Sequence, residues 1–186
     1  KIVAGAEHGI YFVDCKNILL SECDVEELGK KGVALMGDSE NFLLSDLTLR
    51  ENWLGGLFID GDAKNGIIEG CDISANKGAI NFAAGISLAS IPLTDKYSTM
   101  KNKWVDVPLY ERTDAPNHLV IRNNNISDNM SIGIISESGY YNYYIGNKIN
   151  NNDKEGLCQD EGSFANYMRD NEVCGNGRRI RQTDED

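Results

Sequence analysis

The chain has 186 residues, of which 41% are hydrophobic, and its 29 acidic and 18 basic residues give a net charge of −11. An acidic surface of this size repels nucleic acid and anionic lipid, so the composition argues against both as partners. The sequence contains no apolar run of about 18 or more residues, so no membrane-spanning helix is predicted in it. It also shows no basic and then apolar leader, so no intact secretion signal is recognised.

A regular repeat runs along the chain from its first residues. An apolar residue opens each unit, and the openings are 23, 24, 24, 53, 23 and 24 residues apart, so only one interval is irregular. They are Ile2, Val25, Leu49, Ile73, Ile126, Ile149 and Val173. Asparagine follows three positions later, at Asn52, Asn76, Asn129, Asn152 and Asn176, and glycine seven positions later, at Gly9, Gly32, Gly56, Gly133 and Gly156. A fixed period of this length predicts a solenoid.

Each unit contains two predicted strands. The first follows the glycine, as in GVALM and GLFID, and the second follows a turn, as in NFLLSDLTL and NGIIEGCDI. Alternation of period two places Val33 and Leu35 on one face, and no segment has sustained helical spacing. The units therefore predict an all-β parallel solenoid of about seven coils, in which equivalent residues stack about 4.8 Å apart.

Stacking makes further predictions about the repeated columns. The asparagines tolerate left-handed turn conformations and are expected to hydrogen-bond up the axis as a ladder. Oppositely charged residues fall above one another, as at Glu69 and Arg122. Cys23 and Cys71 share a column two coils apart, about 9.6 Å, which exceeds the reach of a disulfide, so buried packing is the expected role.

The irregular interval predicts a loop insertion at residues 87–116, after the strand AINFAAG. The irregular interval is about 29 residues longer than one coil. The insertion concentrates cations and aromatic residues: Lys101, Lys103, Trp104, Tyr110 and Arg112. Aromatic rings can stack on sugars, and lysine or arginine can pair with uronate or sulfate groups. Equally, Trp104 and Tyr110 can pin the loop onto the solenoid. A lysine at 101 or 103 is also a candidate proton-abstracting base if its pKa is lowered.

An acidic strip is predicted on the outward face of the first strand. The residues four positions after the glycine are Val13, Met36, Asp60, Glu137 and Asp160, and we assign Ala84 to the same column in the coil that lacks a glycine at this position. Carboxylates one strand spacing apart are expected to bind a cation or to share a proton. Asp60, Glu137 and Asp160 are therefore candidate ligands for Ca²⁺ and candidate acid and base groups for glycoside hydrolysis. The alternative is a solvated acidic face without a ligand.

The coils at residues 32–78, punctuated by Asn and Gly, resemble the right-handed parallel β-helix superfamily of pectate lyases and other carbohydrate-active proteins. The resemblance covers most of the chain outside the insertion and implies a single right-handed β-helix domain over residues 1–186. The superfamily holds lyases, hydrolases, epimerases, phage tailspikes and non-catalytic proteins, and fold alone does not select among them. Catalytic signatures of the polygalacturonases, alginate epimerases and pectate lyases are absent from the sequence.

These observations together predict an enzyme that cleaves an acidic, uronate-containing polysaccharide by lyase or hydrolase chemistry, between the acidic strip and the insertion. The predicted catalytic residues are Asp60, Glu137, Asp160 and Lys103, the first three also being the candidate Ca²⁺ ligands. The predicted substrate-binding residues are Trp104, Arg112, Lys101, Tyr110 and Tyr140. The competing hypothesis is a non-catalytic carbohydrate-binding or structural solenoid. We expect a piece of a longer extracellular or cell-surface protein, because both ends fall inside the periodic pattern.

Overall fold

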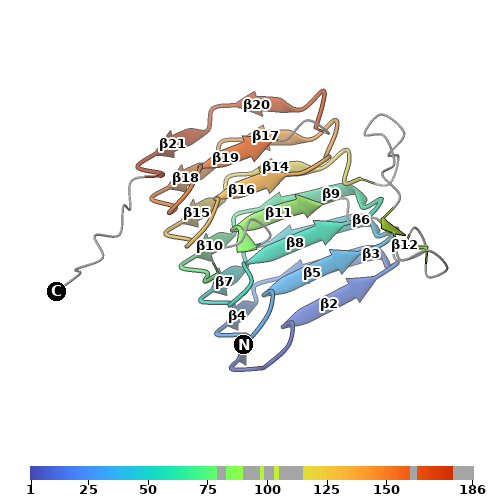
Figure 1. The fold of residues 1–186 in the computed structure, drawn as a ribbon, viewed down its shortest axis with the longest axis horizontal. Helices are drawn as coiled ribbons and strands as arrows, with labels where there is room; N and C mark the ends of the chain where they lie inside the picture. The colour runs from blue at the N-terminus through green and yellow to red at the C-terminus, as the bar shows by residue number, and fades with distance from the viewer. Residues whose placement is uncertain (79–82, 90–96, 99–102, 105–114, 160–162, 178–186) are drawn as a thin grey trace.

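The computed structural model describes residues 1–78, 83–89, 97–98, 103–104, 115–159 and 163–177. Parallel strands stack coil upon coil in chain order, from the blue N-terminal coil to the red C-terminal coil (Figure 1). The predicted all-β parallel solenoid is confirmed.

Three parallel sheets form the sides of the solenoid. Sheet A contains β1 (Ile2–Val3), β4 (Asp24–Glu26), β7 (Thr48–Arg50), β10 (Asp72–Ser74), β15 (Asn125–Ser127), β18 (Lys148–Asn150) and β21 (Glu172–Cys174). Sheet B contains β2 (Ile10–Val13), β5 (Val33–Met36), β8 (Leu57–Asp60), β11 (Ile86–Ala89), β16 (Ile134–Ser136) and β19 (Leu157–Gln159). Sheet C contains β3 (Lys16–Ser21), β6 (Glu40–Ser45), β9 (Lys64–Glu69), β14 (Val120–Arg122), β17 (Tyr143–Ile145) and β20 (Tyr167–Arg169). A separate antiparallel pair, β12 (Tyr97–Ser98) and β13 (Lys103–Trp104), lies in the insertion.

Each complete coil has three strands instead of the two predicted. Segments such as NFLLSDLTL were expected to form one strand, but the chain turns between sheets C and A at residues in the left-handed region. These include Glu22, Asp46, Gly70 and Asn123, whose φ angles are 53°, 53°, 64° and 54°. A single left-handed residue redirects the chain without interrupting the apolar alternation, so the sequence pattern does not reveal the corner.

The strand register reproduces the predicted period and places the insertion. Ile73 pairs with Ile126 across the long interval, so that interval is one coil with added residues. The sheet B strand of this coil is β11, Ile86–Ala89, which begins after the predicted strand AINFAAG, whose first four residues lie outside the described residues. Residues 87–89 therefore belong to the solenoid, and the insertion starts later than predicted. The chain has rejoined sheet C by Asn117, which bridges to Lys64 and Tyr140.

Gly85 completes the glycine column, which the sequence analysis left without a member in this coil. A Cβ on Gly85 would lie 2.7 Å from Cγ2 of Ile126 and 2.8 Å from the carbonyl oxygen of Gly133. The column requires glycine because atoms of the following coil occupy the space where a side chain would stand: the apolar residue that opens that coil in most cases, and Asn52 at Gly32.

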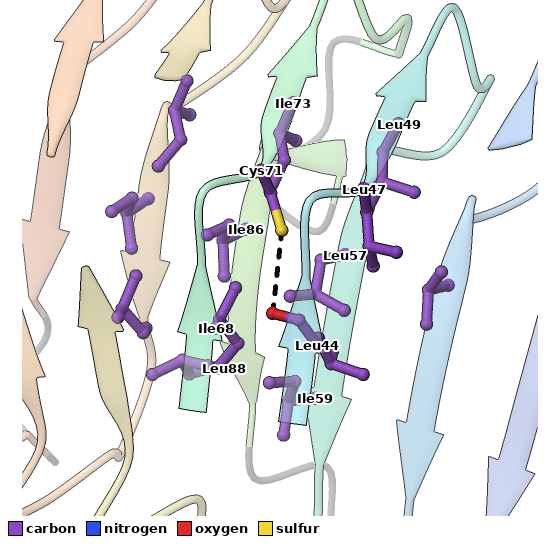
Figure 2. Close-up of a cluster of buried hydrophobic side chains, with 14 of the residues drawn as sticks. Leu44, Leu47, Leu49, Leu57, Ile59, Ile68, Cys71, Ile73, Ile86 and Leu88 are labelled. Carbon is purple, nitrogen blue, oxygen red and sulfur yellow. Dashed lines mark hydrogen bonds between the residues drawn. The ribbon is translucent and has the colours of Figure 1, made fainter. Parts of the chain in front are cut away.

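The inward side chains form one continuous apolar core (Figure 2). Leu57 stacks below Ile86 and Ile59 below Leu88, with each side chain fully buried. Cys71 is also buried in this core, whereas Cys23 is only half-buried. The buried packing role predicted for Cys71 is confirmed.

Asparagines form the predicted ladder at the corner between sheets A and B. The Nδ2 group of Asn52 donates to Oδ1 of Asn76 at 3.1 Å, and each later member donates to the next at 2.9 Å, as far as Asn176. A second ladder, at Asn124, Asn147 and Asn171, lies at the corner between sheets C and A and was not predicted. It continues the column in which earlier coils place Cys23, Leu47 and Cys71.

Charged residues pair between coils on the outside. Nε of Arg122 donates to Oε2 of Glu69 at 2.7 Å, which confirms that predicted pair. Such exposed pairs contribute about 0–1 kcal/mol each. In the described part of the chain, no helix is long and apolar enough to cross a bilayer.

Candidate functional site

The outer face of sheet B carries two columns of side chains. The first contains Tyr11, Ala34, Phe58, Ser87, Ile135 and Cys158. The second contains Val13, Met36, Asp60, Ala89 and Glu137 in the described residues. Ala89, and not Ala84, occupies this column, because the glycine of its coil is Gly85.

The predicted acidic residues of the second column differ in their surroundings. Asp60 and Glu137 lie two coils apart with Ala89 between them, as the repeat predicted. Asp60 is only 3% exposed, and its Oδ1 accepts a hydrogen bond from its neighbour, the N–H of Gly61, at 2.8 Å. Glu137 is half-buried. Asp60 is thus held against its own turn and is not an open, solvated carboxylate.

The Ca²⁺ hypothesis stays a prediction. Asp160, its third proposed ligand, lies outside the described residues. Within the part of the chain that the structure describes, His, Cys, Asp and Glu side chains form no group of three or more that could hold a metal.

Most of the predicted substrate-binding residues lie in the insertion. Lys101, Tyr110 and Arg112 are outside the described residues, and of Lys103 and Trp104 only the backbone is described, in β13. Their backbones pair with β12 in the order Tyr97 to Trp104 and Ser98 to Lys103. Their proposed roles stay predictions.

Tyr140 lies at the corner between sheets B and C, in an aromatic cluster. Its ring stacks on Phe164 with centroids 5.1 Å apart and an angle of 2° between the planes, and it meets Tyr141 edge to face at 5.6 Å. Tyr141 and Phe164 are exposed, whereas Tyr140 is half-buried. One face of the Tyr140 ring is therefore covered by Phe164.

Lys31 is the residue that the sequence analysis missed. Its side chain is only 5% exposed, and its Nζ lies 4.7 Å from the centroid of the Phe58 ring, on the outer face of sheet B. No hydrogen-bond acceptor contacts this Nζ among the described residues. Burial lowers the pKa of the Lys31 amine to about 7, although the charge of Glu137 acts in the opposite direction. A buried amine that has no hydrogen-bond partner among the described residues marks a candidate site.

Lys31 combines chemical features that a catalytic base or an anion-binding group needs. A lysine with a pKa near 7 is substantially unprotonated at neutral pH and can accept a proton. When protonated, it has no counter-ion at hydrogen-bond distance in the described part of the chain, so an anionic ligand would stabilise it. The burial of Lys31 was not predictable from the sequence, because this residue stands in a turn beside Lys30 and is covered by Phe58 of the next coil.

Comparisons with known proteins give the family and one similar structure. A family model described as a right handed beta helix region matches residues 1–173. The crystal structure of the periplasmic alginate epimerase AlgG is similar, with a TM-score of 0.61 and 13% sequence identity, over 94% of this chain and 42% of that one. This chain therefore spans about two fifths of that protein, and at this identity the likeness is one of fold. No curated protein matches the sequence.

Proposed function

The chain belongs to the right-handed β-helix family, and we propose that it cleaves an acidic, uronate-containing polysaccharide on the outer face of sheet B. The observation that carries this proposal is the buried Nζ of Lys31, which lies over the ring of Phe58. The charge of Glu137 acts to raise the pKa of this amine, against the larger effect of burial. The similar structure is that of an alginate epimerase, and alginate is itself an acidic polysaccharide. Both observations support a carbohydrate-active role.

The reaction that best suits these groups is β-elimination. The unprotonated amine of Lys31 removes the proton on the carbon next to the uronate carboxylate. The electrons of that C–H bond form a carbon–carbon double bond, and the glycosidic oxygen leaves with its bonding electrons and takes up a proton. We place the base at Lys31, and Lys103 is the alternative proposed from the sequence. The proposal also includes a cation, either Ca²⁺ at Asp60, Glu137 and Asp160 or the guanidinium of Arg112, to neutralise the uronate carboxylate.

A specific observation favours the competing, non-catalytic hypothesis. Asp60 is buried and bonded to the N–H of Gly61, which is what a carboxylate that stabilises a turn would do. The same observation makes hydrolysis by Asp60 and Glu137 less favourable than elimination, because one of the two carboxyl groups is already engaged.

The test is the formation of unsaturated uronate products, followed by ultraviolet absorbance, from a panel of uronate polysaccharides with Ca²⁺ or with a chelator. We expect Lys31→Met, which keeps the side-chain volume, to lower kcat by about 100-fold or more. Lys148→Met, at an exposed lysine of sheet A, is the matched control and should leave the rate unchanged.

The pH profile separates the roles of Lys31. If its amine is the base, the wild-type rate rises with pH through about 7. Full activity in Lys31→Met would show that the base lies elsewhere. Absence of product from every uronate, with and without Ca²⁺, would favour the non-catalytic solenoid.

A further inference from the structure

An exposed tryptophan marks a pocket at the corner between sheets A and B. Trp53 directly follows Asn52 of the ladder, and 60% of the residue is exposed. With residues of neighbouring coils it lines a cavity of about 490 Å³. An indole that is this exposed leaves much of its surface, ring face included, available to a ligand.

The pocket exists because the coil below Trp53 has no side chain at the equivalent position. The equivalent residue is Gly29, whose N–H donates to the carbonyl oxygen of Gly5 at 2.7 Å. A Cβ on Gly29 would lie 2.4 Å from the carbonyl oxygen of Ala6, so a larger residue does not fit. The backbone at Gly5 and Gly29 therefore forms a floor beside the indole of Trp53.

Charged side chains line the same pocket as the indole of Trp53. Glu27 and Glu51 occupy equivalent corner positions in successive coils, and both have left-handed backbone conformations, with φ angles of 57° and 54°. Nζ of Lys77 pairs with Oε2 of Glu51 at 3.1 Å, whereas Glu27 makes no ion pair with any described residue. The pocket thus offers an indole, the exposed carboxylate of Glu27, which has no ion-pair partner among the described residues, and the ammonium group of Lys77. Glu27, Glu51 and Lys77 together carry a net charge of −1.

We propose that this corner binds an uncharged pyranose, as a carbohydrate subsite separate from the outer face of sheet B. The C–H face of a pyranose packs on the indole of Trp53. Its hydroxyl groups donate to the Glu27 carboxylate and accept from the Lys77 ammonium group. The net negative charge of the pocket disfavours a uronate. This site stands on its own residues and does not depend on cleavage at Lys31.

The experiment follows the indole N–H signal of Trp53 in the two-dimensional NMR spectrum of the full chain, assigned with Trp53→Phe. The probes are neutral hexasaccharides of glucose, mannose and xylose, with an oligogalacturonate as the charged comparison. A neutral sugar should shift this signal in a saturable way, and Trp53→Ala should weaken its binding about tenfold or more. Tyr167→Ala, which removes an exposed aromatic residue of sheet C, should leave the affinity unchanged.

Glu27→Gln tests the choice of ligand. This variant should keep the affinity for the neutral sugar within a fewfold and gain binding of the oligogalacturonate. The proposal is overturned if Trp53→Ala binds the neutral sugar as well as wild type does, if the oligogalacturonate alone shifts the Trp53 signal, or if none of the four probes shifts it.

Discussion

The asparagine ladder and Lys31 are both buried and polar, but their surroundings are opposite. Asn76 is fully buried; its Oδ1 accepts from the N–H and Nδ2 of Asn52, and its Nδ2 donates to the carbonyl oxygen of Leu49 and to Asn129. The amine of Lys31 is almost as buried and has no hydrogen-bond partner among the described residues. Burial of a polar group costs free energy unless hydrogen bonds offset it, so the ladder stabilises the fold and Lys31 does not. The difference indicates which buried polar groups serve structure and which are available for a ligand.

The strongest test of the ladder removes a central member. Asn76→Ala removes the two bonds that Oδ1 of Asn76 accepts from Asn52 and the two that its Nδ2 donates, to the carbonyl oxygen of Leu49 and to Oδ1 of Asn129. We expect it to lower the free energy of unfolding by about 4 kcal/mol, measured by urea unfolding followed by circular dichroism. Asn125→Ala, at an exposed asparagine of β15, is the control and should change it by less than about 0.5 kcal/mol. Similar losses in the two variants would mean that the ladder hydrogen bonds do not stabilise the solenoid.

Lys31→Met should raise the free energy of unfolding, which is the opposite of the effect expected for Asn76→Ala. Burial lowers the pKa of Lys31 in the folded protein from 10.5 to about 7. Below pH 7 the amine is protonated in both states and the folded state bears the full desolvation cost, so we expect the variant to be more stable than wild type by about 3 kcal/mol.

This advantage should shrink as pH rises. Between pH 7 and about 10.5 the unfolded wild type binds more protons than the folded one, so wild-type stability rises relative to the variant. Urea unfolding of both proteins over this range measures the difference. A difference that is independent of pH, or a variant less stable than wild type at pH 6, would show that the amine has a partner that offsets its burial.

The sequence predicted what depends on the period and missed what depends on contacts between coils. The first asparagine ladder recurs in every later coil, so its spacing alone predicted it. The ladder of Asn124, Asn147 and Asn171 occupies only the later coils, and earlier residues of that column are Cys or Leu. Periodicity therefore gave no continuous signal for it.

The candidate site was less predictable for the same reason. Alternation placed Asp60 and Glu137 correctly in one outward column, but it could not predict that Asp60 is buried against Gly61. Lys31 depends on a ring from the next coil, and a residue before a glycine turn carries no mark of such a neighbour. In the insertion the period is lost, so no register was available from which to predict contacts of Lys103 or Trp104.

The second ladder allows a test with a smaller expected effect on stability. Its first asparagine is Asn124, and the equivalent position one coil earlier is Cys71. Sγ of Cys71 lies 3.8 Å from the carbonyl oxygen of Leu44 (Figure 2). In the next coil the equivalent group, Nδ2 of Asn124, donates to the carbonyl oxygen of Ile68 at 3.0 Å. The N–H of Cys71 already donates to Oδ1 of Asn124 at 2.9 Å. An amide at position 71 would therefore find an acceptor in Leu44 and a ladder neighbour in Asn124.

We expect Cys71→Asn to change the free energy of unfolding by less than about 1 kcal/mol, despite placing an amide in the apolar core. Leu47→Asn is the matched control, since the same amide one coil earlier would have Cys71 as its neighbour and no Oδ1 to donate to; it should cost about 3 kcal/mol. Adding Leu47→Asn to Cys71→Asn should cost less than Leu47→Asn alone, because the two amides would then continue the ladder. Urea unfolding of the four proteins measures this coupling, and equal costs for Leu47→Asn in both backgrounds would contradict the view that an adjacent amide is what makes a buried amide tolerable here.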